Sequence, residues 1–140
     1  MTPTLFGRWQ TRVLLLATVG VFVTVPFWLA QGQSSWVYFA LLGYIALFGL
    51  AWDGLYIYLQ KFRWDRDWPG VFQLLGGIGE GLLIAGLAKT VGLPGISPQI
   101  FNVGVFICHY GLVWLATYLA SVSLTRILFP RGRFRGGRWL

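Results

Sequence analysis

Cysteine, histidine and acidic residues are scarce in this chain. Its 140 residues include one cysteine, one histidine and four acidic residues, and only 11% of them are charged. A single cysteine excludes an internal disulfide framework, and one histidine with one cysteine excludes a His/Cys zinc cluster. Intrinsic disorder is also excluded, because a chain that is 56% apolar cannot stay solvated. No nucleophile lies at a recognisable spacing from a base, so the sequence predicts no catalytic residue and favours a non-enzymatic role without deciding it.

Long apolar runs are abundant instead, and the mean hydropathy is +0.67. Four runs, at 13–30, 36–58, 71–88 and 100–127, are close to the roughly 20 residues that a helix needs to cross a bilayer. Short connectors between such helices make sequential neighbours antiparallel. The sequence therefore predicts an all-α integral membrane protein, one up-down-up-down bundle of four transmembrane helices. The 13–30 run is longer than the apolar region of a signal peptide, so we expect an uncleaved first span.

The basic residues predict the orientation of this bundle. All of them except Lys89 precede the first run, lie between the second and third runs, or lie at or beyond the end of the fourth. Because basic residues accumulate on the cytoplasmic side of membrane proteins, both ends of the chain are expected to be cytoplasmic. The membrane is either the plasma membrane or an internal one.

Two ionisable residues fall near the middle of predicted spans. Glu80 in the third run and His109 in the fourth reach similar depths when a helix rises 1.5 Å per residue. An unpaired polar group in hydrocarbon is costly, so we expect the two side chains to meet at the midplane. Three interpretations stay open: a structural hydrogen bond, a pair that handles protons or ions, and a haem or chlorophyll-type pigment site with His109 as axial ligand.

A second polar group is expected nearer the cytoplasmic face. Asp53 in the second run is predicted to pair with Gln73, or with Arg63 or Arg66 of the following loop. Asn102 begins a stripe of polar and small residues that recurs every seven positions through His109. Stripes of this kind are typical of inward faces in a membrane bundle.

The third run also contains a Gly-xxx-Gly spacing, formed by Gly77 and Gly81 and extended by Ala85. Small residues at this spacing allow a second helix backbone to come close. The spacing predicts helix packing, either inside the bundle or in a homo-oligomer.

Two segments outside the runs carry most of the charge. The 61–69 segment is expected to form a cytoplasmic elbow at the membrane surface, with the residues Arg63, Trp64, Asp65, Arg66, Asp67 and Trp68. The 130–140 segment is a basic tail with Arg131, Arg133, Arg135 and Arg138. Basic residues beside a span attract anionic lipid, so membrane lipid, and not nucleic acid, is the expected partner of this tail.

Three functions remain open on the sequence alone. The first is an accessory or interaction subunit of a larger membrane complex, in contact with other membrane subunits or with copies of itself. The second is an oligomeric transporter of protons, ions or small solutes that uses Glu80 and His109. The third is the haem- or pigment-binding subunit. We predict no metal site. For the first two functions we also expect no resident cofactor.

Overall fold

The computed structural model describes residues 5–30, 36–62, 70–123 and 127, and these residues form a helical bundle. α1 (Leu5–Leu15), the π-helical segment η1 (Leu16–Gly20) and α2 (Val21–Ala30) follow one another without a break. The other helices are α3 (Val37–Gln60), α4 (Gly70–Thr90) and α5 (Val103–Val122). Within these ranges no strand forms, and Leu93 and Ile96 make only an isolated bridge in the connection after α4.

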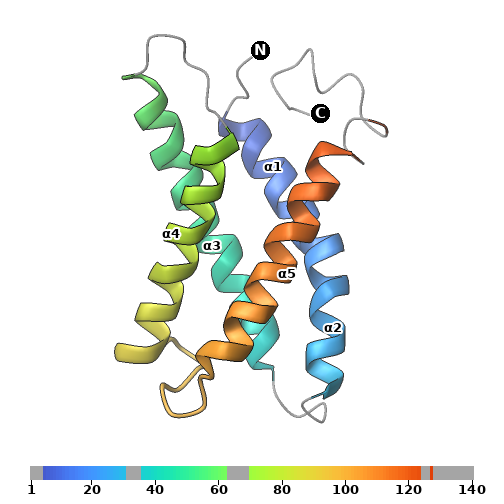
Figure 1. Cartoon of the computed structure of the whole chain (residues 1–140), viewed down its shortest axis with the longest axis vertical. Helices are drawn as coiled ribbons and strands as arrows, with labels where there is room; N and C mark the ends of the chain where they lie inside the picture. Colours follow the sequence, from blue (N-terminus) through green and yellow to red (C-terminus); the bar gives the residue numbers. More distant parts are fainter. Residues whose placement is uncertain (1–4, 31–35, 63–69, 124–126, 128–140) are drawn as a thin grey trace.

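The helices alternate in direction (Figure 1). α1 begins and α5 ends at the same end of the bundle, and α3 and α4 run in opposite directions. α3 packs against α1, α2 and α4, while α5 packs against α1, α2 and α4. The combined first helix and α4 therefore lie diagonally across the bundle. The antiparallel four-helix arrangement expected from the sequence agrees with this fold.

Three helices are long and apolar enough to cross a membrane among the residues described: Leu5–Ala30, Val37–Gln60 and Val103–Val122. α4, with 21 residues, is not one of these three. The first helix begins at Leu5 and not at residue 13, so it includes the two arginines that were expected before the membrane.

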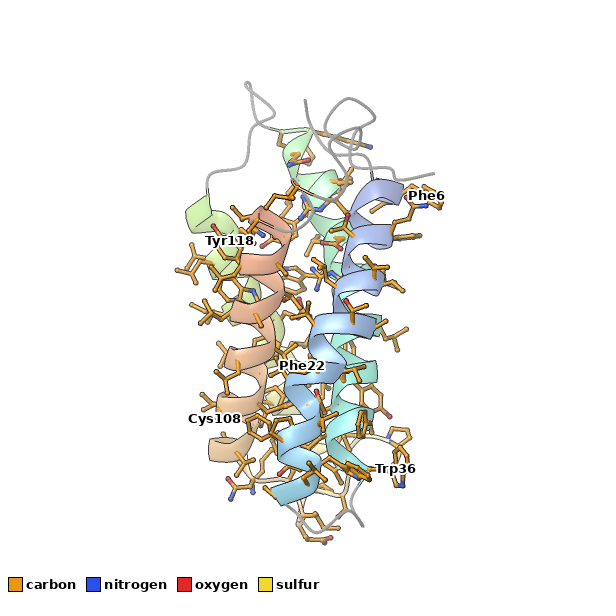
Figure 2. The ribbon with its side chains drawn as sticks, turned by 90° about the vertical axis from the view of Figure 1, so that its right-hand side faces the viewer. Phe6, Phe22, Trp36, Cys108 and Tyr118 are labelled. Atoms are coloured by element: carbon orange, nitrogen blue, oxygen red, sulfur yellow. The ribbon has the colours of Figure 1, made fainter. Side chains whose placement is uncertain are left out.

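Large apolar side chains cover the outside of the bundle (Figure 2). Phe22, Leu47, Leu82 and Ile107 all point outward and are well exposed. The interior also contains aliphatic and aromatic residues, among them Leu41, Ile45, Ile84, Phe106 and Val113. An apolar exterior around an apolar core suits a helix bundle surrounded by lipid.

The π-helical segment sets which residues of the first helix face inward. The N–H of Val21 donates to the carbonyl of Leu16, five residues earlier, which marks one extra residue in the turn. At 3.6 residues per turn, Arg12 and Thr24 would point about 120° apart in a regular helix. The inserted residue reduces this difference to about 20°, so both side chains reach the bundle interior.

Candidate functional site

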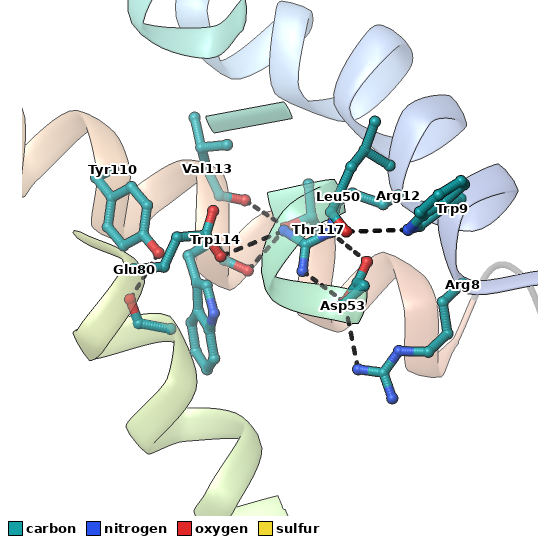
Figure 3. A network of polar contacts seen from close by, with 11 residues as sticks. Arg8, Trp9, Arg12, Leu50, Asp53, Glu80, Tyr110, Val113, Trp114 and Thr117 are labelled. Carbon is teal, nitrogen blue, oxygen red and sulfur yellow. Dashed lines mark hydrogen bonds and ion pairs between the residues drawn. The ribbon is translucent and has the colours of Figure 1, made fainter. Parts of the chain in front are cut away.

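A network of charged side chains joins three helices inside the bundle (Figure 3). Arg12 of α1 donates from Nε to Asp53 Oδ2 at 2.8 Å and from Nη2 to Asp53 Oδ1 at 3.0 Å. Its third nitrogen, Nη1, lies 3.5 Å from Oε2 of Glu80 on α4. Asp53 and Glu80 are only 2% and 3% exposed. Arg12 therefore crosses the diagonal of the bundle and binds α3 and α4 to the first helix.

Arg8 extends this network toward the end of the bundle. Its Nη2 lies 3.4 Å from Asp53 Oδ1, and its guanidinium carbon lies 5.3 Å from the centre of the Tyr56 ring. The next residue, Trp9, donates from Nε1 to the carbonyl of Leu50 at 3.0 Å. These contacts hold α1 in register with α3, and the two arginines balance the two buried carboxylates in formal charge.

Glycines make the room for this network. A Cβ atom on Gly49 would meet the guanidinium of Arg12, and a Cβ on Gly76 would meet the hydroxyl of Tyr56. The chain needs glycine here because a bulky side chain from the neighbouring helix occupies the space beside the backbone.

Aromatic rings of α5, rather than a helix backbone, pack against Gly77 and Gly81. A Cβ on Gly77 would meet the indole of Trp114, and one on Gly81 would lie 2.8 Å from Cε1 of Tyr110. The Tyr110 hydroxyl donates to the Gly77 carbonyl at 2.6 Å. Gly77 and Gly81 thus accommodate aromatic rings of α5, Ala85 packs against the apolar core, and the predicted close contact with a helix backbone has no support.

His109 occupies a separate polar position between α5 and α2. The residue is 0% exposed, and its Nε2 lies 2.9 Å from the Thr24 hydroxyl oxygen. That hydroxyl donates to the carbonyl of Gly20 at 2.7 Å. The rings of Phe27 and Tyr38 pack against the imidazole with centroid distances of 5.0 and 5.5 Å.

The expected direct pair of Glu80 and His109 is wrong. Glu80 contacts Arg12 and His109 contacts Thr24, and no hydrogen bond joins the two residues. The depth estimate placed them on neighbouring helices correctly. The pairing failed because Arg12 was placed outside the membrane and Thr24 was counted within an apolar run. Neither residue was therefore considered as a partner for Glu80 or His109.

The expected contact of Asp53 with Gln73 is also corrected, whereas the alternative partners Arg63 and Arg66 lie outside the described residues. Gln73 is exposed on α4, and Asp53 is bound instead by Arg8 and Arg12. Sequence reasoning missed these two arginines because the apolar run begins only at Val13. Their spacing of four residues, which places both on one helix face, was the available signal.

Asn102 is not an inward polar residue of a span. It is exposed and caps α5, where its side-chain oxygen accepts from the N–H groups of Gly104 and Val105 at 2.9 and 3.2 Å. The inward face of α5 contains Phe106, His109 and Val113 instead.

The predicted elbow and basic tail lie outside the described residues. They comprise Arg63, Trp64, Asp65, Arg66, Asp67 and Trp68 of the elbow and Arg131, Arg133, Arg135 and Arg138 of the tail.

His109 Nε2 is in hydrogen-bond contact with the Thr24 hydroxyl, and the rings of Phe27 and Tyr38 pack around the imidazole. Axial ligation of a tetrapyrrole through Nε2 would therefore require Thr24 and these rings to move. In the part of the chain that the structure describes, no three His, Cys, Asp or Glu side chains gather as a metal site would require.

Comparison with protein families, curated proteins and solved structures finds no match for this chain.

Proposed function

We propose that this protein is a four-span integral membrane protein, with both ends cytoplasmic, that acts as an accessory subunit of a larger membrane complex. The observation that carries the proposal is the contrast between its interior and its surface. Asp53 and Glu80 are compensated by arginines of the same chain, whereas the outward faces of the helices are apolar. Such a molecule interacts mainly through its surface, with lipid and with neighbouring membrane helices.

The charge network also supports α4 as the fourth span. Glu80, a costly group in hydrocarbon, points inward to Arg12 and away from lipid. On the outward side α4 presents Leu74, Leu75, Ile78 and Leu82. A helix of 21 residues is about 31 Å long, which matches the hydrocarbon thickness.

An oligomeric transporter is the second candidate, and one observation favours it. Glu80 Oε1 and His109 Nδ1 are both buried without a hydrogen-bond partner among the described residues. Buried ionisable groups in membrane helices often mark ion or proton pathways. Here, however, the polar contacts of His109 end at the carbonyl of Gly20, which cannot pass on a proton.

Native purification distinguishes these two functions. We expect the chain, extracted from its own membrane in mild detergent, to migrate in a complex with another membrane protein at fixed stoichiometry. Removal of this chain from the cell should reduce the size or the stability of that complex. A homo-oligomer that gives a proton or ion flux in liposomes, abolished by Glu80→Gln, would contradict the accessory role.

Reporter fusions test the orientation independently. Fusions within 31–35 and 89–99 should map to the side opposite the cytoplasm, and fusions at Asp65 and Leu140 to the cytoplasmic side. A fusion at Asp65 that maps to the same side as the 31–35 loop would refute the four-span topology.

A further inference from the structure

The π-helical segment Leu16–Gly20 interrupts an otherwise regular first helix. Its turn holds one residue more than an α-helical turn, because the N–H of Val21 donates to the carbonyl of Leu16. Single π-helical turns within α-helices are rare and occur frequently at functional sites. Since a regular helix is the common state of such a segment, contacts on either side must retain the extra residue here.

Polar contacts hold the first helix on both sides of the segment. Before it, Arg12 binds Asp53 at 2.8 and 3.0 Å. After it, Thr24, which is 0% exposed, has its hydroxyl oxygen 2.9 Å from Nε2 of His109. In a regular helix Arg12 and Thr24 would point about 120° apart. The extra residue therefore allows both contacts to form at the same time.

A regular helix would bring Val23 to the place of Thr24. Val23 follows Arg12 by eleven residues, so at about 100° per residue the two side chains would point within about 20° of each other. His109 Nε2 would then face a hydrocarbon side chain. The Thr24 hydroxyl would keep a partner, because it donates to the carbonyl of Gly20 in its own helix at 2.7 Å. The imidazole is thus the polar group that favours the observed rotation of α2.

The other side chains of α2 discriminate weakly between the two rotations. Apart from Thr24 and the indole of Trp28 they are hydrocarbon, and lipid tails are as apolar as the interior of a bundle. The ring of Phe27 packs on His109 at a centroid distance of 5.0 Å, and Pro26 would take its place. Pro26 also has no N–H for the carbonyl of Phe22, so the turn after the π-helical segment has one backbone hydrogen bond fewer.

From these observations we propose that the π-helical segment is a rotation joint of the first helix, held in its present state by the contact between Thr24 and His109. When this contact is lost, the segment becomes α-helical and α2 turns by about 100° relative to α1. The turn changes the side chains that α2 presents to lipid or to a neighbouring helix, while the Arg12 network stays in place. The inference rests on the proposed membrane location, which the reporter fusions test separately, and not on the accessory role.

Electron paramagnetic resonance of the full chain in lipid bilayers tests the joint. Cys108 is replaced by alanine, and a nitroxide is attached to a single cysteine at position 21 or 22. Phe22 is 80% exposed and Val21 is partly buried, so the label at 22 should be the more accessible to oxygen. After rotation each residue of α2 occupies the place of the residue that follows it. In Thr24→Val we therefore expect the reverse order, with the label at 21 the more accessible.

Thr24→Ser is the matched control, and it should keep the original order because its hydroxyl can still meet His109. A label at Val13, before the segment, should give the same accessibility in every variant. An unchanged order at 21 and 22 in a folded Thr24→Val protein, a reversed order in Thr24→Ser, or a large change at Val13 would overturn the proposal.

Two further variants keep the test decisive if Thr24→Val does not fold. The double variant Val23→Thr, Thr24→Val retains one hydroxyl and places it opposite His109 only in the regular helix, so we expect the reversed order. Deletion of Ala17, an exposed residue of the π-helical segment, should remove the extra residue and keep the original order, because Arg12 and Thr24 then face inward on a regular helix. The original order in the double variant, or a reversed order after the deletion, would overturn the joint.

Discussion

Replacement of Arg12 by methionine should destabilise the bundle more than any other single loss of charge. The change removes two hydrogen bonds to Asp53, at 2.8 and 3.0 Å, and the contact with Glu80. Two buried carboxylates then remain, and among the described basic residues Asp53 keeps only Arg8, at 3.4 Å. Loss of one partner from a buried ion pair costs about 3–5 kcal/mol in soluble proteins. Hydrogen bonds between membrane helices are weaker, about 0.6 kcal/mol on average, so we expect about 3 kcal/mol, or roughly a hundredfold in the unfolding equilibrium.

The measurement is a reversible unfolding titration with SDS in mixed micelles, followed by tryptophan fluorescence. Arg8→Met is the matched control, because Arg8 makes one long ion pair with Asp53 and a cation–π contact with Tyr56, whose loss should cost only about 1 kcal/mol. A triple variant that replaces Arg12 by methionine and both carboxylates by leucine should recover most of the loss, since apolar replacement of a whole buried ionic group is often neutral or stabilising. An Arg12→Met protein as stable as Arg8→Met, or a triple variant weaker than Arg12→Met, would refute the reasoning.

Three further predictions use the same unfolding assay. Gly49→Ala should lower the free energy of unfolding by about 1–3 kcal/mol, because its Cβ would displace the guanidinium of the charge network. Gly54→Ala on the same helix has open space and should be neutral or slightly stabilising. Gly77→Ala should cost a similar 1–3 kcal/mol through the indole beside it, whereas Gly86→Ala should not; equal values for these two would contradict the ring packing. Asn102→Ala should cost about 1 kcal/mol through loss of the helix cap, and no change would show that water replaces the cap freely.

The number and order of the helices could be predicted from the sequence because hydrocarbon imposes a length and a composition on each span. Runs of about 20 apolar residues correspond to α3 and α5 within a few residues of their ends. The first helix was predicted too short, since charge was taken to end a span. Arg8 and Arg12 are tolerated within the helix because Asp53 meets them from α3.

The partners of the polar residues could not be predicted in the same way. Hydropathy and depth are properties of one helix at a time, whereas a hydrogen bond depends on how two helices are rotated about their axes. Glu80 and His109 had matching depths, yet each faces a different residue of the first helix. The extra residue in the π-helical segment Leu16–Gly20 sets that rotation, and no periodicity of the apolar residues revealed it.

The amino-acid sequence alone thus determined that this chain is helical, that its helices are long and apolar, and that its few charges need partners. These properties follow from local composition, because each apolar run and each ionisable group can be weighed separately against hydrocarbon. Only the tertiary structure decided which partners the charges have. Arg12, on the first helix, binds Asp53 and Glu80 on α3 and α4, and this choice depends on glycines that leave room for its side chain. Contacts between distant parts of the chain arise from packing, which acts on all the helices at once.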